Sequence, residues 1–302
     1  MSVITSGNHP KLQWPGIHAL WGLKYNEHAK EYNDLFEFDT SDKSYEEIVE
    51  NIGFGLAPVK PQGASVAYDI TTQGVVNRAT HVAYALGYIV TYEEMADNLY
   101  FRKSKERAAS NAFSMNQTKE YVFANAYNRA FSGSYVFGDA VALLSASHPT
   151  AAGVQSNLLT TAADLSEASL EDMTIQIMQA KNSRGLLIGL KPKTLHIAPS
   201  NYYNAERILK TTLVTGTANN DINVINRNNV IPGGAKVNHF FTDADAWFLR
   251  TDCPTSMIAF QREAISFAQD NDFDTKNAKA AAYERYSYTI GDWRGLFGSP
   301  GA

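Results

Sequence analysis

The sequence predicts an α+β fold, with an extended hairpin and one long helix in the first half of the chain. Two stretches with apolar–polar alternation, residues 65–70 and 80–90, indicate strands. Residues 106–131 repeat apolar side chains every three or four positions, which is typical of a long amphipathic helix. A mixed helix and strand pattern follows from residue 165. With 302 residues the chain can form one large domain or two.

Before the first predicted strand, residues 1–24 have little periodicity and predict an irregular N-terminal arm. Trp14 and Trp21 are the bulky side chains expected to anchor this arm on another surface, for which a neighbouring subunit is one candidate. Residues 25–52 are predicted to be mostly helical, and the segment "SYEEIVENIGFG" is expected to end this region at Gly53.

The two alternating stretches are expected to pair as a hairpin within residues 56–91, because "TTQGVVNRA" between them supplies Gly74 and Asn77 for a turn. A two-stranded hairpin is marginal in water unless another surface covers its bulky face. We expect a neighbouring subunit to supply that surface. The predicted contact residues are Val66, Tyr68, Ile70, Val82, Tyr84, Leu86 and Tyr88.

The long helix would measure roughly 40 Å at 1.5 Å per residue. Its stripe contains Ala112, Ala126 and Ala130, and these small side chains predict close packing on a sheet of the same subunit. Residues 132–134, "SGS", are expected to end it. Residues 280–299 alternate again and predict a C-terminal strand.

Composition excludes several classes of protein. The net charge of −5 disfavours nucleic acid and anionic membranes as main partners, because both reward a basic surface. The single cysteine, Cys253, excludes an internal disulfide and a thiolate metal cluster. The N-terminus lacks the basic and apolar regions of a signal peptide, and no stretch reaches the about 18 apolar residues of a membrane span.

The adjacent Ser147 and His148 raise the question of a serine hydrolase. A nucleophilic serine needs an imidazole held against its hydroxyl, a geometry that sequence neighbours rarely reach, and no G-x-S-x-G motif occurs. The seven histidines are scattered without H-E-x-x-H, and no phosphate-binding glycine loop is present. We therefore expect no catalytic residue, no metal site and no cofactor, and interpret Ser147 and His148 as part of a structural turn.

Three segments resemble the major capsid proteins of tailed bacteriophages, which have the HK97-like fold, and are most similar to the Mu-like head-subunit branch. They are "GDAVALLSASHPTAAGVQSNLLTTAADLSEASLE" (138–171), "LKPKTLHIAPSNYYNAERIL" (190–209) and "GDWRGLFGS" (291–299). The likeness covers nearly the whole chain, although residues 1–24 and 215–245 match only in outline. It implies a major capsid (head) protein that self-assembles into an icosahedral shell around phage DNA. A non-viral, encapsulin-like nanocompartment is the alternative with a related fold, and the hydrolase is a more distant one.

The resemblance also implies a division of the chain. It consists of an N-terminal arm and following helical segment (1–55), an E-loop hairpin (56–91), a peripheral or P domain (92–164 and 251–302) that includes a spine helix (104–132), and an axial or A domain (165–250).

The partners implied by the resemblance are mainly further copies of this chain, arranged as hexamers and pentamers. The chain begins with the arm, so separate scaffold and protease proteins, or a cleaved form, are implied, together with a portal protein. Packaged double-stranded DNA would lie inside without sequence-specific binding, and no membrane is involved. The expected location is the virion, after assembly in the host cytoplasm.

Overall fold

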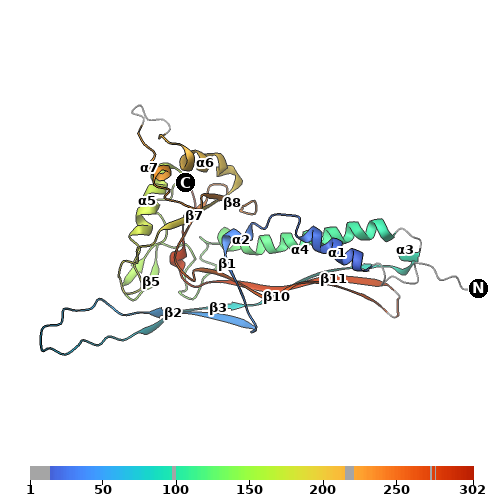
Figure 1. Ribbon diagram of the computed structural model, residues 1–302, viewed down its shortest axis with the longest axis horizontal. Coiled ribbons are helices and arrows are strands. Elements are labelled where there is room, and N and C mark those ends of the chain that lie inside the picture. Colours follow the sequence, from blue (N-terminus) through green and yellow to red (C-terminus); the bar gives the residue numbers. More distant parts are fainter. Residues whose placement is uncertain (1–13, 97–99, 215–220, 273, 276) are drawn as a thin grey trace, which may run out of the picture.

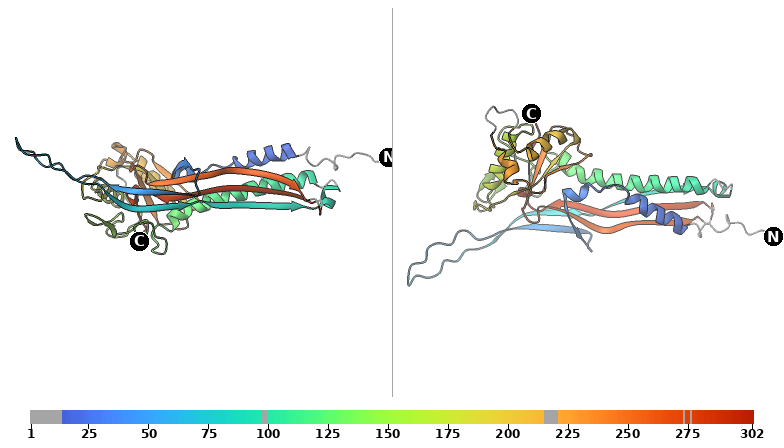
Figure 2. Two further views of the ribbon diagram at one scale, coloured as in Figure 1. Left: turned by 90° about the horizontal axis from the view of Figure 1, so that it is seen from below. Right: turned by 45° about the horizontal axis from the view of Figure 1, so that its top comes forward.

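The computed structural model describes residues 14–96, 100–214, 221–272, 274–275 and 277–302, and it shows an elongated subunit (Figure 1). At one end a long helix lies along a sheet, and at the other stands an α/β lobe. A thin hairpin projects past the lobe (Figure 2). Within these described ranges, no helix is both long and apolar enough to cross a membrane.

The first sheet supports the long helix, α4 (Tyr100–Asn128). Its four strands have the order β1-β10-β11-β4, and β1 is parallel to β10 while the other pairs are antiparallel. The strands are β1 (Glu37–Thr40), β10 (Met257–Asn271), β11 (Ala278–Ile290) and β4 (Val82–Val90). Three shorter helices contact α4, namely α1 (Trp14–Tyr25), α2 (Tyr32–Leu35) and α3 (Tyr92–Ala96).

The lobe contains a second four-stranded sheet with the order β12-β9-β7-β8. Its strands are β12 (Leu296–Ser299), β9 (Trp247–Thr251), β7 (Pro192–Ile197) and β8 (Ala235–Val237). The other elements of this part are β5 (His148–Thr150), β6 (Gly153–Gln155), α5 (Glu167–Met178), η3 (Pro199–Asn201), α6 (Tyr202–Lys210), α7 (Val224–Arg227) and η4 (Trp293–Gly295). After β11 the chain thus leaves the first sheet, and its C-terminal strand β12 pairs with β9 in the lobe.

The projecting hairpin consists of β2 (Tyr45–Ile52) and β3 (Thr72–Thr80), which pair with each other in an antiparallel two-stranded sheet. Residues 53–71 connect them as a long loop without regular structure. The chain continues from β3 directly into β4 of the first sheet. The hairpin is therefore an extension of that sheet.

The prediction that residues 25–52 are mostly helical is wrong, because this stretch forms the strands β1 and β2 and a single helical turn, α2. Ile48 and Ile52 have helical spacing, but the structure uses the alternating set Glu46, Ile48, Glu50 and Ile52, which is half-buried while the intervening side chains are exposed. Pairing with β3 satisfies the backbone groups and overrides a weak local helix propensity.

The predicted pairing of residues 65–70 with 80–90 is also wrong. Strand β4 forms where alternation predicted a strand, but its partner is β11, and residues 65–70 lie in the loop between β2 and β3. The period-two pattern identifies β4 correctly but carries no information about its partner, because that partner lies almost two hundred residues away in the sequence.

The predicted irregular arm contains a regular helix, α1, and Trp21 anchors it within its own subunit. The Trp21 indole stacks on Phe267 at 5.2 Å between ring centroids and donates a hydrogen bond of 2.9 Å to Asn111 Oδ1 on α4. Trp14 begins α1, but its side chain lies outside the described part of the structure. The anchoring role is thus intramolecular for Trp21.

The long helix is confirmed as one continuous element, and Ala112, Ala126 and Ala130 are buried as predicted. Phe113, which also fits the apolar spacing, is instead exposed. Beneath the helix, the rings of Phe123 and Tyr84 each stack on the ring of Tyr286, at centroid distances of 5.4 and 4.7 Å, respectively. These aromatic contacts connect α4, β4 and β11 in one core.

The junction between the long helix and the lobe contains a buried histidine, His196 on β7. Its Nε2 lies 2.9 Å from the Thr194 hydroxyl, and its ring is tilted against Tyr127 of α4 at a centroid distance of 5.8 Å. Burial, with the nearby positive charges of Arg250 and Lys236, lowers the pKa of His196 to about 3. The imidazole is therefore neutral at physiological pH.

We predict that Ala126→Asp destabilises the subunit by at least about 3 kcal/mol, because the new carboxylate would lie in the core between α4 and its sheet. Chemical denaturation of the unassembled subunit measures this change. Ser110→Asp, on the exposed side of the same helix, is the matched control and should change the unfolding free energy little. Equal effects of the two variants would contradict the packing of α4.

We also predict that the contribution of His196 to stability depends on pH. The folded pKa of about 3 lies below the ordinary value of 6.5, so the contribution is fully present above pH 6.5 and is lost as the pH falls toward 3. The difference in unfolding free energy between wild type and His196→Gln should therefore shrink across this window, by at most about 1.4 kcal/mol per pH unit.

Denaturation at several pH values measures that difference. Thr194→Val removes a neighbouring group and keeps the imidazole, so this control should retain the pH dependence of the wild type. A pH-independent difference for His196→Gln would contradict the neutral, buried state of the ring.

Candidate assembly interface

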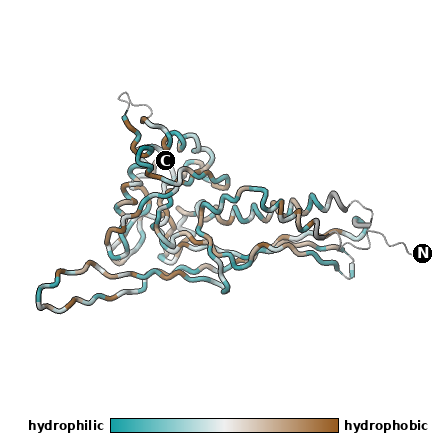
Figure 3. The backbone as a smooth tube through the Cα atoms, in the orientation of Figure 1, coloured by the Kyte–Doolittle hydropathy of each residue, from teal (hydrophilic) through white to brown (hydrophobic). Residues whose placement is uncertain are grey.

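Large apolar side chains on the projecting loop are left in solvent by the subunit. Figure 3 shows hydrophobic and hydrophilic segments following one another along this loop. Val59 is 93% exposed and Tyr68 is 95% exposed, values close to those of an unfolded chain. The other exposed apolar members of the loop are Phe54, Leu56, Val66 and Ile70. A concentration of this kind marks a surface that another molecule covers.

Local sequence explains why this segment remains extended. Glycine and proline recur along it, and proline can neither donate a backbone hydrogen bond nor continue a helix. At the tip, the amide of Ala64 donates to the Pro61 carbonyl at 3.1 Å, and Gly63 has φ of +82°, in the left-handed region that this turn requires. The apolar side chains between these turns have no core to enter.

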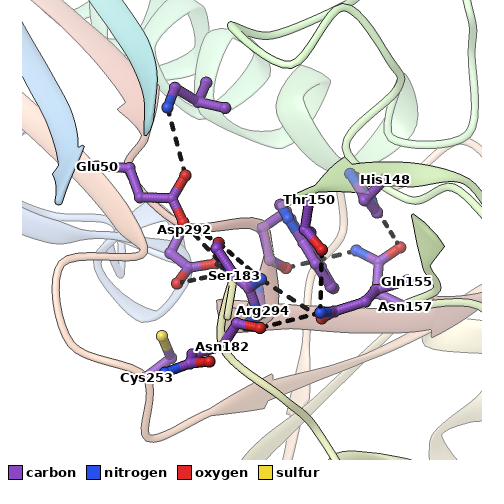
Figure 4. Close-up of polar contacts among 12 residues, drawn as sticks. Glu50, His148, Thr150, Gln155, Asn157, Asn182, Ser183, Cys253, Asp292 and Arg294 are labelled. Atoms are coloured by element: carbon purple, nitrogen blue, oxygen red, sulfur yellow. Dashed lines mark hydrogen bonds and ion pairs between the residues drawn. The ribbon is translucent and has the colours of Figure 1, made fainter. Parts of the chain in front are cut away.

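Near the end of β2, where the loop begins, a polar network joins this strand to the lobe (Figure 4). The Ser183 hydroxyl donates to the Glu50 carboxylate, and the buried Arg294 guanidinium lies 3.8 Å from the same carboxylate. Arg294 Nε donates to the Lys181 carbonyl at 2.6 Å, and its Nη1 donates to Asp292 at 3.1 Å. Opposite charges and complementary donors thus satisfy a guanidinium that is almost entirely removed from water.

The predicted contact residues do not form one continuous face. Val66, Tyr68 and Ile70 are exposed on the loop, whereas the other four lie on β4 in the first sheet. On β4, the partly buried Tyr84 and Tyr88 pack against core clusters of the same subunit, while Val82 and Leu86 are exposed. The structure therefore separates the predicted face into a projecting part and a part within the subunit.

Sequence reasoning missed Phe54, Leu56 and Val59, which extend the exposed apolar part of the loop. The signal available in the sequence was the run "GFGLAPVKPQGASV", where apolar residues alternate with glycine and proline and no periodic element can bury them. It also missed Glu50 and Arg294. Their meeting depends on long-range contacts, for which no local pattern exists.

Ser147 and His148 do not form a catalytic pair. The buried His148 ring places Nδ1 at 2.6 Å from Asp139 Oδ2 and Nε2 at 3.1 Å from Asn157 Oδ1, so both nitrogens are engaged. The ring also stacks on Trp293 at 4.2 Å between centroids. The exposed Ser147 hydroxyl lies 3.2 Å from the Ser145 hydroxyl. This arrangement fixes a turn and leaves no imidazole nitrogen available to activate a serine.

Other chemistry has little support in the described residues. Within them, no group of three or more His, Cys, Asp and Glu side chains is placed to hold a metal ion. Burial raises the pKa of the Cys253 thiol to about 12, with a further contribution from Asp292. A thiol of this kind is protonated and unreactive at neutral pH.

The fold of the chain is similar to that of several solved structures. The chain is similar to a virus-like particle from Pyrococcus furiosus, with 10% identity, a TM-score of 0.54 and coverage of 94% of this chain and 98% of that one. It is also similar to a chain of Mycobacterium phage Adephagia, with 11% identity, a TM-score of 0.53 and coverage of 99% and 98%. A capsid structure of the cyanophage P-SCSP1u gives 10% identity, a TM-score of 0.54 and coverage of 91% and 88%. These likenesses show that this chain shares its fold with those chains.

A sequence profile described as "Phage capsid protein" matches residues 74–298, which is more than half of the chain. No curated protein sequence matches this chain. The chain belongs to the phage capsid protein family. It is a major capsid protein, a structural component that self-assembles into the multi-subunit shell of the virion.

We predict that Ser147→Ala changes the unfolding free energy by no more than about 0.5 kcal/mol, since the hydroxyl is exposed. His148→Ala should cost on the order of 3 kcal/mol, because it leaves the Asp139 carboxylate buried without its partner. Denaturation of the two single variants measures both values. Ester or peptide hydrolysis by wild type that both variants lose would contradict the structural role.

Proposed function

We propose that this protein is an HK97-type shell subunit of the Mu-like branch, and that its projecting loop packs on a neighbouring copy in the shell. One observation carries the proposal. The loop exposes six large apolar side chains, with Val59 and Tyr68 more than nine-tenths accessible, on an extension that the subunit itself does not cover. Burial of such side chains against a second copy releases water from apolar surface and favours assembly.

The strand pairing supports a changed division of the chain. We assign β2, β3 and residues 53–71 to the E-loop, in place of residues 56–91, because β4 pairs with β11 in the first sheet. We assign the first sheet and α4 to the P domain, with α4 as the spine helix. We assign the second sheet to the A domain. This domain then includes the C-terminal strand β12 in addition to residues 165–250. The N-terminal arm includes α1.

A shell of this type would consist of hexamers and pentamers, in which each subunit repeats the same contacts around the capsomer. Closure of the shell leaves few free edges, so many weak contacts add up to a stable particle. We propose that it encloses double-stranded DNA in an icosahedral particle without sequence-specific binding, in keeping with the net charge of −5. Assembly in the host cytoplasm with separate scaffold, protease and portal proteins completes the proposal.

Replacement of residues 56–68 by a four-residue Gly-Ser turn tests the role of the loop. The cut leaves β2, β3 and β4 in place, so circular dichroism and the unfolding midpoint should match those of wild type. Sedimentation and electron microscopy should show that shells no longer form, because the apolar contact is lost. A cut through residues 67–86 would instead remove β3 and more than half of β4, and would damage the core sheet.

A matched pair of substitutions separates apolar contact from loop length. Leu56→Ser with Val59→Ser and Tyr68→Ser should abolish assembly, whereas Lys60→Ser with Gln62→Ser, at exposed polar positions of the same loop, should permit it. Normal shells from the shortened chain or from the apolar triple variant would contradict the proposed contact.

A further inference from the structure

Two polar contacts attach the projecting hairpin to a single turn of the lobe, residues 181–186. The inner contact is the Glu50–Ser183–Arg294 network where the loop leaves β2, and the outer contact joins Arg184 to Asp69 in the loop. We propose that Arg184 is a positioning residue for assembly, which fixes the direction in which the loop projects by holding Asp69. One attachment would leave the loop free to swing about its base, whereas two attachments define a direction.

The outer contact has the geometry of a fork. Arg184 Nη1 donates to Asp69 Oδ2 at 3.0 Å, and Nη2 donates to the Ile70 carbonyl at 2.7 Å. Nη2 also reaches Asp69 Oδ1 at 3.3 Å. A planar guanidinium that engages a carboxylate and a carbonyl together restricts rotation as well as distance. Such restriction is what orientation of a thin loop requires.

Asp69 passes this restraint to both sides of the loop. Its Oδ2 accepts a hydrogen bond of 2.8 Å from the Gly55 amide on the outgoing side, and its Oδ1 accepts one of 2.8 Å from the Ile70 amide on the returning side. These backbone donors, with a smaller contribution from Arg184, lower the pKa of Asp69, so the carboxylate is charged at neutral pH. Asp69 therefore joins the two sides of the loop, and Arg184 holds both sides through Asp69.

The turn that presents Arg184 is itself rigid. Asn182 Oδ1 accepts from the amides of Arg184 and Leu186, each at 2.9 Å, and Gly185 has φ of +84° in the left-handed region. Gln155 Nε2 donates to the Asn182 carbonyl at 3.0 Å, and Arg294 holds the Lys181 carbonyl. The turn is thus held to the lobe by contacts that do not involve the hairpin.

The outer contact is also the weaker of the two. Arg294 at the inner contact is 2% exposed, whereas the side chains of Arg184 and Asp69 are 27% and 42% exposed. In the part of the chain that the structure describes, the hydrogen bonds and ion pairs from residues 53–71 to the lobe all end on Arg184. Because exposed ion pairs are screened by salt, this contact can be released without damage to the fold.

The inference rests on the proposed function, in which the loop must reach a neighbour, so its test measures loop direction separately from assembly. Nitroxide labels at Val59→Cys on the loop and Ile175→Cys on α5 report the distance distribution between loop and lobe in the unassembled, full-length subunit. Both positions are exposed, and the buried Cys253 thiol does not compete for the label.

Arg184→Ala should widen this distribution by about twofold, since a loop held at one end samples more directions. Arg184→Lys retains the charge without the fork and should give an intermediate width. Arg78→Ala is the matched control, because Arg78 pairs with Glu47 inside the hairpin and not with the lobe, and it should leave the width unchanged. Salt of about 1 M, where the Debye length is about 3 Å, should widen the wild-type distribution.

Light scattering of the unlabelled variants then reports assembly. A wider distribution with slow or malformed assembly supports the inference. A distribution as narrow in Arg184→Ala as in wild type overturns it, whatever the assembly result. A wider distribution with normal assembly also overturns the inference, because the direction that Arg184 gives the loop would then not matter for assembly, whereas the apolar contact itself is tested by the shortened loop and the triple serine variant.

Discussion

The packing of α4 on the first sheet is the constraint on which the rest of the subunit depends. Phe123, Tyr286 and Tyr84 form a continuous aromatic stack that joins the helix to β11 and β4. Next to this stack, the buried Lys119 of α4 forms an ion pair with Glu284 of β11. Burial lowers the pKa of Lys119, and the adjacent Glu284 carboxylate opposes that shift. Apolar contact thus holds the helix on the sheet, and the ion pair favours one register.

The inner face of the first sheet is covered by α4 and α1, and the hairpin of β2 and β3 lies outside the core that they form. It leaves the body instead, and its direction depends on polar contacts with the lobe. The subunit therefore combines a rigid body, in which aromatic and aliphatic side chains are buried, with an extension whose apolar side chains remain exposed. This division is physically suited to a protein whose most exposed apolar surface becomes buried only when copies meet.

The sequence predicted the elements whose residues lie in one periodic stretch. The long helix and strand β4 follow from spacing alone, and the burial of Ala126 follows from the same stripe. The partner of β4 and the strand state of residues 45–52 could not be predicted, because both depend on pairing with distant or competing segments. For the candidate interface, Val66, Tyr68 and Ile70 were found from alternation, whereas Arg184 and Asp69 are brought together only by the fold.

The central claim is that residues 53–71 are exposed in the subunit and buried against a second copy in the shell. Amide hydrogen exchange of the unassembled subunit and of the purified shell, measured under the same conditions, tests it directly. We expect the loop amides to exchange within the earliest times in the subunit and to become strongly protected in the shell, while the amides of α4 remain protected in both. Equally fast exchange of residues 53–71 in both states would contradict the account.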